Sequence, residues 1–131
     1  MKTILFACVH NAGRSQIAAA FFNRLANPAL ARAISAGTRP AEQVHPEVVA
    51  AMGEVGIDLR AARPQPLTAE LARGADLLVT MGCGDECPTM RPMRHLDWQL
   101  ADPQGGSLER VRLIRDDIGD RVRDLVSREQ W

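Results

Sequence analysis

Continuous apolar runs and regularly spaced apolar residues alternate along the chain, and their order predicts alternating strands and helices. The runs at 3–8 (TILFAC) and 75–81 (ADLLVTM) are typical of buried strands in a parallel sheet. A further strand is predicted at 31–38 (ARAISAGT), where Gly37 closes it, and a short one at 94–98 (RHLDW). These four segments are the expected strands of the sheet.

Apolar residues three or four positions apart predict helices at 15–26 and 46–55 and a shorter helix at 67–73. Pro46 and Thr68 stand where helix starts favour proline and threonine. The C-terminal segment has the most regular pattern, carried by Leu108, Val111, Ile114, Ile118, Val122 and Leu125. Its arginines interleave with acidic residues, and we expect these charge pairs on the outer face of the helix.

Strands that alternate with helices predict an α/β fold. We expect a single three-layer domain over residues 1–131, with a four-stranded, mostly parallel sheet flanked by helices. Ligands of such sheets bind beyond the carboxyl ends of the strands. The loops after Cys8 and Met81 both leave such ends, so they are predicted to open on the same edge of the molecule.

Composition narrows the class of protein. The chain has 131 residues, of which 46% are hydrophobic and 24% charged, as in a soluble globular protein. Sixteen basic residues balance sixteen acidic ones, and no apolar stretch reaches the roughly 18 residues of a membrane span, so neither nucleic acid nor membrane is an expected partner. Three cysteines suit thiol chemistry in a reducing compartment better than a disulfide framework. We expect a cytoplasmic protein that acts as a monomer.

The segment CVHNAGRS joins the first predicted strand to the first helix and carries the candidate chemistry. A loop that enters a helix N-terminus binds anions, because the first backbone N–H groups of the helix have no helical partner. Asn11 and Gly13 tolerate the curled backbone that such a loop needs, and Arg14 offers a planar fork for two oxygens of a tetrahedral oxyanion. The predicted oxyanion-binding residues are Val9, His10, Asn11, Ala12, Gly13, Arg14 and Ser15.

Cys8 is the candidate nucleophile of this loop. It is predicted to lie at the bottom of the anion site, where the positive environment favours a thiolate over a thiol. Ser15 is placed to donate its hydroxyl to the sulfur. His10 has two open interpretations, a residue that tunes the site electrostatically or a solvated loop histidine.

A second loop, GCGDECP, carries the other two cysteines, Cys83 and Cys87. They could form half of a zinc site with His95, or be two unrelated buried thiols. A fourth ligand is missing and the C-x-x-x-C spacing is uncommon for zinc, so no metal is predicted. Glycines beside Cys83 and acidic residues beside Cys87 favour an exposed loop over the core.

The cysteine, five residues, arginine and serine of CVHNAGRS resemble the signature of the low-molecular-weight protein tyrosine phosphatase superfamily. The resemblance extends to SAGT at 35–38, to the strand at 75–81 and to Asp102-Pro103. It implies that Cys8 attacks the oxyanion, that Arg14 binds it and that Asp102 is the general acid. It further implies that Asn11 shapes the loop, that Ser15 stabilises the thiolate, and that the fold is the phosphatase-like one.

Two departures point away from a tyrosine phosphatase. The chain has no tyrosine, so none follows Asp102-Pro103, and Gly13 stands where the phosphatase branch commonly has a second cysteine. The segment MGCGDECP is similar instead to the redox segment of thioredoxin-coupled arsenate reductases built on the same fold. This resemblance implies an enzyme of arsenic detoxification, with arsenate as substrate, a thioredoxin-like reductant and no cofactor.

In the relay that this resemblance implies, Cys8 attacks arsenic, Cys83 then attacks Cys8, and Cys87 finally attacks Cys83. Mycothiol or glutaredoxin could reduce the same final disulfide. A low-molecular-weight phosphatase acting on a non-tyrosine phosphate ester is the first alternative. A non-catalytic sensor of an oxyanion or a metal is the second, although it would leave Asp102 without a purpose.

Overall fold

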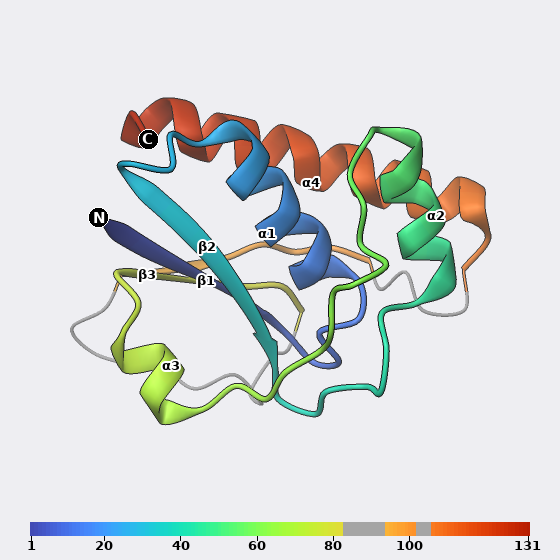
Figure 1. Ribbon diagram of the computed structural model, residues 1–131, viewed down its shortest axis with the longest axis horizontal. Coiled ribbons are helices and arrows are strands. Elements are labelled where there is room, and N and C mark those ends of the chain that lie inside the picture. Colours follow the sequence, from blue (N-terminus) through green and yellow to red (C-terminus); the bar gives the residue numbers. More distant parts are fainter. Residues whose placement is uncertain (83–93, 102–105) are drawn as a thin grey trace.

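The computed structural model of this protein describes residues 1–82, 94–101 and 106–131, and its centre is a four-stranded parallel sheet (Figure 1). The strands lie in the order β2-β1-β3-β4, and each neighbouring pair is parallel. Their bounds are β1 Lys2–Cys8, β2 Ala31–Gly37, β3 Leu77–Thr80 and β4 Arg94–Asp97. The predicted four-stranded parallel sheet is confirmed.

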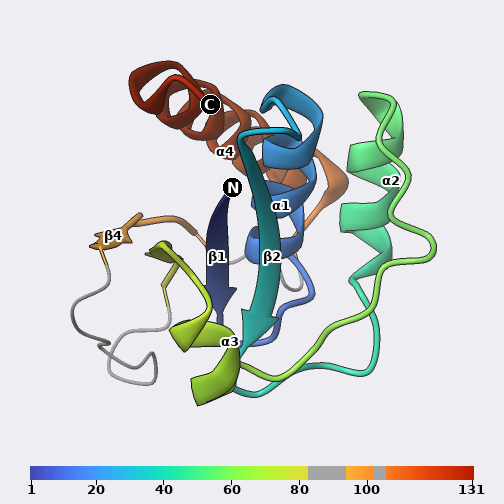
Figure 2. The same ribbon diagram turned by 60° about the vertical axis from the view of Figure 1, so that its left-hand side comes forward.

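Helices cover both faces of the sheet. Their bounds are α1 Arg14–Leu25, α2 Pro46–Glu54, α3 Ala69–Arg73 and α4 Leu108–Glu129. Helices α1, α2 and α4 lie on one face and the short α3 on the other, which gives the three predicted layers (Figures 1 and 2). Within the residues that the structure describes, none of the helices is both long and apolar enough to cross a bilayer.

Local sequence explains where the helices begin. Pro46 occupies the first turn of α2, where its missing N–H removes no helical hydrogen bond. The hydroxyl of Thr68 accepts a hydrogen bond from the backbone N–H of Leu71, and Ser107 does the same for Arg110 at the start of α4. Helix α4 runs past its last predicted residue to Glu129 and ends at Gln130 in the left-handed conformation.

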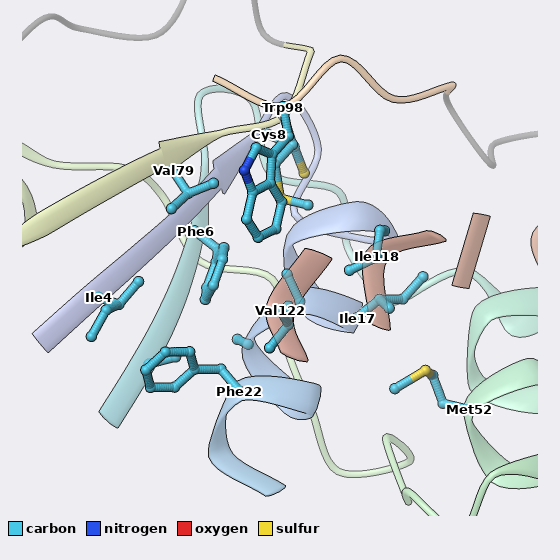
Figure 3. Close-up of a cluster of buried hydrophobic side chains, with 14 of the residues drawn as sticks. Ile4, Phe6, Cys8, Ile17, Phe22, Met52, Val79, Trp98, Ile118 and Val122 are labelled. Carbon is cyan, nitrogen blue, oxygen red and sulfur yellow. The ribbon is translucent and has the colours of Figure 1, made fainter. Parts of the chain in front are cut away.

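The core places Cys8 at the end of a rigid strand. Alternate side chains of β1 face the two layers, so Ile4, Phe6 and Cys8 share the larger hydrophobic cluster with α1 and α4 (Figure 3). The ring of Phe6 lies 6.1 Å from that of Phe22 and 5.8 Å from that of Trp98, measured between centroids. This packing fixes β1, and therefore the position of the cysteine at its carboxyl end.

One expectation for the C-terminal helix is wrong. Arg115 does not stand on the outer face of α4, because α2 packs against that side of the helix and leaves Arg115 only 8% exposed. Its Nη1 donates to the carbonyl of Ala51 and to Oε1 of Glu54, each at 2.9 Å. Arg112 also binds Glu54, at 2.6 Å from Nη2 to Oε2. Both arginines join α4 to the carboxyl end of α2, and of the two only Arg115 is buried.

The two arginines change the acidity of Glu54. The pKa of Glu54 falls from 4.5 to about 2, chiefly because of the hydrogen bond from Arg112. Burial opposes this shift, and the hydrogen bond from Arg115 adds to it. The outer-face expectation does hold further along α4, where Arg121 pairs with Asp117 and Arg123 with Asp120 on exposed surface.

Candidate functional site

The loop between β1 and α1 curls around the start of the helix. Asn11 has a positive φ of 51°, a left-handed conformation that asparagine tolerates better than most residues. Gly13 occupies the N-cap position of α1 and has no side chain with which to cap it. The N–H groups of the first helical turn are therefore not occupied by an N-cap side chain, which is the condition for an anion site.

A neighbouring segment, residues 38–45, holds this loop from outside through backbone hydrogen bonds. Four N–H groups of the segment bind loop carbonyls: Thr38 to Cys8 at 3.2 Å, Arg39 to Val9 at 2.8 Å, Ala41 to His10 at 2.9 Å and His45 to Ala12 at 3.0 Å. In a trans peptide the C=O and N–H point in opposite directions. The N–H groups of the same peptide units therefore point away from the segment.

Gly37 allows this close approach. It pairs with Cys8 at the end of the parallel β1–β2 ladder. A Cβ on residue 37 would lie 2.6 Å from the carbonyl oxygen of Val9 and 2.9 Å from the backbone nitrogen of Asn11. Both atoms belong to backbone that cannot swing aside, so the loop requires glycine at this position.

The sulfur of Cys8 has a defined polar partner. Its Sγ lies 2.9 Å from Oγ of Ser15, and Oγ also accepts a hydrogen bond of 2.7 Å from Nδ2 of Asn11. Because the amide supplies its own proton to Oγ, the hydroxyl proton of Ser15 is left to point at the sulfur. Such a donor favours the ionised form of a thiol. Cys8 itself is 2% exposed.

Arg14, the first residue of α1, lies where β3 ends. Its side chain is largely buried, and the residue is 5% exposed. Gly82, with a φ of 83°, stands so close that a Cβ there would overlap Nη1 of Arg14. Arg14 follows the loop after β1, and its guanidinium contacts the chain that leaves β3. This contact is expected for loops at the same edge of a parallel sheet.

The structure brings together part of the predicted site. Cys8, Asn11, Arg14 and Ser15 converge at the start of α1, and the loop residues between them are Val9, His10, Ala12 and Gly13. Cys83, Cys87 and Asp102 lie outside the described residues. Whether those three residues join the site stays a prediction.

The alternative zinc site of Cys83, Cys87 and His95 stays untested, because both cysteines lie outside the described residues. Among residues 1–82, 94–101 and 106–131, no three His, Cys, Asp or Glu side chains are grouped to hold a metal ion. The ring Nε2 of His95 lies 2.9 Å from the hydroxyl of Thr80, which donates to Asp97 at 2.7 Å.

Sequence reasoning missed three residues that support the loop. Gln16 binds Asn11 from within α1, the backbone N–H of Gln65 binds the Asn11 side chain, and Gly82 packs on Arg14. Gly82 offered a weak signal, since it directly precedes Cys83. Gln16 and Gln65 carry no such signal in the sequence, because only the folded chain brings segment 63–65 to the loop and to Gln16.

Comparison with known proteins identifies the family. Residues 3–130 match the family described as low molecular weight phosphotyrosine protein phosphatase, and the chain belongs to this family. The resemblance drawn from CVHNAGRS is thus confirmed, together with its fold.

Within the family, several relatives have names that contain arsenate reductase. A Halobacterium salinarum protein provisionally named arsenate reductase is 41% identical over 124 residues, covering 92% of this chain and 87% of that protein. The glutaredoxin arsenate reductase of Synechocystis is 35% identical over 131 residues, covering 98% of both chains.

Solved structures give the same fold with more than one chemistry. The thioredoxin-dependent arsenate reductase of Corynebacterium glutamicum superposes with a TM-score of 0.86 at 39% identity; the match covers 99% of this chain but only 62% of that longer one. The arginine phosphatase YwlE from Geobacillus stearothermophilus gives a TM-score of 0.88 at 27% identity, covering 99% of this chain and 94% of that one. The fold alone therefore does not separate reductase from phosphatase.

Proposed function

We propose that this chain reduces arsenate to arsenite with Cys8 as the nucleophile and Cys83 and Cys87 as resolving thiols. The observation that carries the proposal is the contact between Gly82 and Arg14. It brings the chain that continues into Cys83 to the guanidinium beside the Cys8 loop. A resolving thiol must approach the sulfur that it attacks, and adjacent Cα atoms are only about 3.8 Å apart.

The first half of the reaction uses the loop. Arsenate is a tetrahedral oxyanion, so its oxygens suit the Arg14 guanidinium and the backbone N–H groups at the start of α1. The Cys8 thiolate attacks arsenic, an As–S bond forms, and one As–O bond breaks. Asp102 donates a proton to the departing oxygen, which leaves as water.

The second half transfers two electrons. The Cys83 thiolate attacks the sulfur of Cys8, a disulfide forms, and the As–S electron pair leaves with arsenic as arsenite. The Cys87 thiolate then attacks Cys83, which releases Cys8 as a thiolate and leaves a Cys83–Cys87 disulfide. Two thiols are oxidised while arsenic(V) becomes arsenic(III), so the electrons balance.

A dithiol reductant completes the cycle. We propose a thioredoxin-like protein, in line with the Corynebacterium relative named as thioredoxin-dependent. The Synechocystis relative is named for glutaredoxin, so a glutaredoxin system is the alternative donor. Both would reduce the Cys83–Cys87 disulfide by thiol–disulfide exchange.

A phosphatase acting on a non-tyrosine phosphate ester is the second candidate. The superposition on the Geobacillus arginine phosphatase favours it, because the same sheet and helices serve hydrolysis there. Two features count against it: relatives of higher identity are named arsenate reductases, and hydrolysis has no use for Cys83 and Cys87.

One assay separates the two candidates. Arsenate-dependent oxidation of NADPH is measured with thioredoxin and thioredoxin reductase, beside hydrolysis of a small aryl phosphate by the same preparation. The proposal expects brisk reduction and slow hydrolysis. Fast hydrolysis without reduction would favour the phosphatase, and binding without turnover in either assay would indicate a sensor.

We further propose that residues 1–131 act as one domain, as a monomer and in the cytoplasm. The single sheet that the described residues share supports the first of these. A cytoplasmic location suits a chemistry that needs reduced thiols.

A further inference from the structure

The side-chain amide of Gln16 lies among three oxygens behind the Cys8 loop. Its Nε2 is 3.1 Å from the carbonyl oxygen of Asn11, 3.3 Å from Oδ1 of the same residue and 3.3 Å from the carbonyl oxygen of Arg63. Gln16 is 6% exposed. Its amide therefore joins the left-handed Asn11 to the distant segment 63–65.

These contacts fix which way the Asn11 amide points. A backbone N–H can only donate, and that of Gln65 binds Oδ1 of Asn11 at 2.9 Å. Gln16 donates to the same oxygen, and by binding Arg63 it holds the segment that carries Gln65. With Oδ1 occupied on this side, Nδ2 must face Ser15.

The direction of the whole chain of hydrogen bonds follows. Protons are donated from Gln65 to Asn11, from Asn11 to Ser15, and from Ser15 to Cys8. If the Asn11 amide turned over, its oxygen would face the Ser15 hydroxyl and take the proton that now points at the sulfur. A thiolate at Cys8 would then lose its side-chain donor.

We propose that Gln16 is a positioning residue for Cys8. It holds Asn11 in its left-handed conformation and the amide of Asn11 in one orientation, so that Ser15 donates to the sulfur. The inference deepens the proposed function, since it rests on Cys8 acting as a thiolate. It makes the reactivity of the sulfur depend on the position of segment 63–65.

The test uses the Cys83→Ser/Cys87→Ser protein, in which Cys8 is the one cysteine left of three. Thiolate absorbance at 240 nm is followed against pH for this parent and for Gln16→Met, which keeps the side-chain length and removes the donor. Gln43→Met makes the same change at an exposed position and is the matched control. Gln16→Glu places a carboxylate against the two Asn11 oxygens and is the stronger variant.

We expect Gln16→Met to move the titration midpoint upward by about one pH unit, the size of a lost hydrogen bond to a charged group. Gln16→Glu moves it further, and Gln43→Met leaves it in place. In a Ser15→Ala background, Gln16→Met adds no shift, because the donor that it orients is gone. Thermal melts establish that each variant is folded. If Gln16→Glu does not fold, the methionine variants alone decide the test.

Two results would overturn the inference. One is an unchanged midpoint in folded Gln16→Met. The other is a shift of equal size with and without Ser15, which would make Gln16 a structural residue. The titration contains no arsenate, so its outcome is independent of whether the chain reduces arsenate.

Discussion

Gly82 packs its α-carbon against the guanidinium of Arg14, with no room for a side chain between them. Gly82 follows β3, whereas Arg14 opens α1 after β1. Because β1 and β3 are parallel neighbours, their carboxyl ends meet at one edge of the sheet. The guanidinium of Arg14 and the chain that leads to Cys83 are therefore in contact at this edge.

Gly82→Ala tests this link. The new methyl group displaces the guanidinium, and we expect kcat/KM for arsenate to fall by about 100-fold, mainly through KM. Gly56→Ala is a matched control, because Gly56 has nearly the same φ, 81° against 83°, and open space around it. Both variants lose about 1–2 kcal/mol of stability to backbone strain. Equal activity in the two variants would show that Arg14 does not depend on Gly82.

Gly37→Ala tests the close approach of residue 37 to the loop after Cys8. The added methyl group meets backbone atoms of Val9 and Asn11, so we expect a loss of about 1–3 kcal/mol of unfolding free energy by urea denaturation, together with weaker arsenate binding. Gly53→Ala is the control, since it lies inside α2 with nothing within 4 Å and should gain about 0.5–1 kcal/mol. If Gly37→Ala changed neither the free energy of unfolding nor arsenate binding, the loop would be free to shift outward.

Replacing single cysteines separates the two halves of the reaction. Cys83→Ser and Cys87→Ser should stop arsenate turnover while sparing any weak hydrolysis of an aryl phosphate, because that hydrolysis needs only the loop. Cys8→Ser should abolish both activities. Steady-state rates of both assays check this. Sustained arsenate reduction by Cys87→Ser with thioredoxin would remove that thiol from the relay.

The ion pairs between α2 and α4 predict a pH dependence of stability. Hydrogen bonds from Arg112 and Arg115 lower the pKa of Glu54 to about 2, so its contribution is complete above 4.5 and disappears as pH falls to about 2. Glu54→Gln should therefore lower the melting temperature at pH 7, with a difference from wild type that shrinks below pH 4.5.

Asp120→Asn is the control for that experiment. It breaks the exposed pair of Asp120 with Arg123, which should matter little at any pH. A constant difference between Glu54→Gln and wild type from pH 7 to pH 3 would contradict the assigned role of Glu54.

The features that sequence predicted well are local. The strand, loop and helix around Cys8 lie within a few residues of one another, and the pattern of apolar residues set all four strands to within about two residues. Cys8, Asn11, Arg14 and Ser15 could be named because a helix start, a curled loop and an arginine act at short range.

The features that sequence missed depend on distant contacts. Gln16 reaches Arg63 across 47 positions, and nothing near either residue marks the pair. The prediction that Arg115 lies on the outer face of α4 was wrong for a related reason. Helical spacing shows which side of α4 is apolar, but not that α2 would also cover the polar residue beside that stripe.

A single turnover tests the central claim most directly. Fully reduced protein receives one equivalent of arsenate without any reductant, is quenched with an alkylating reagent, and is analysed by peptide mass spectrometry together with arsenic speciation. The relay predicts one arsenite per chain, a Cys83–Cys87 disulfide and alkylated Cys8. Absence of arsenite, or arsenite formed with Cys83 and Cys87 both alkylated, would contradict it.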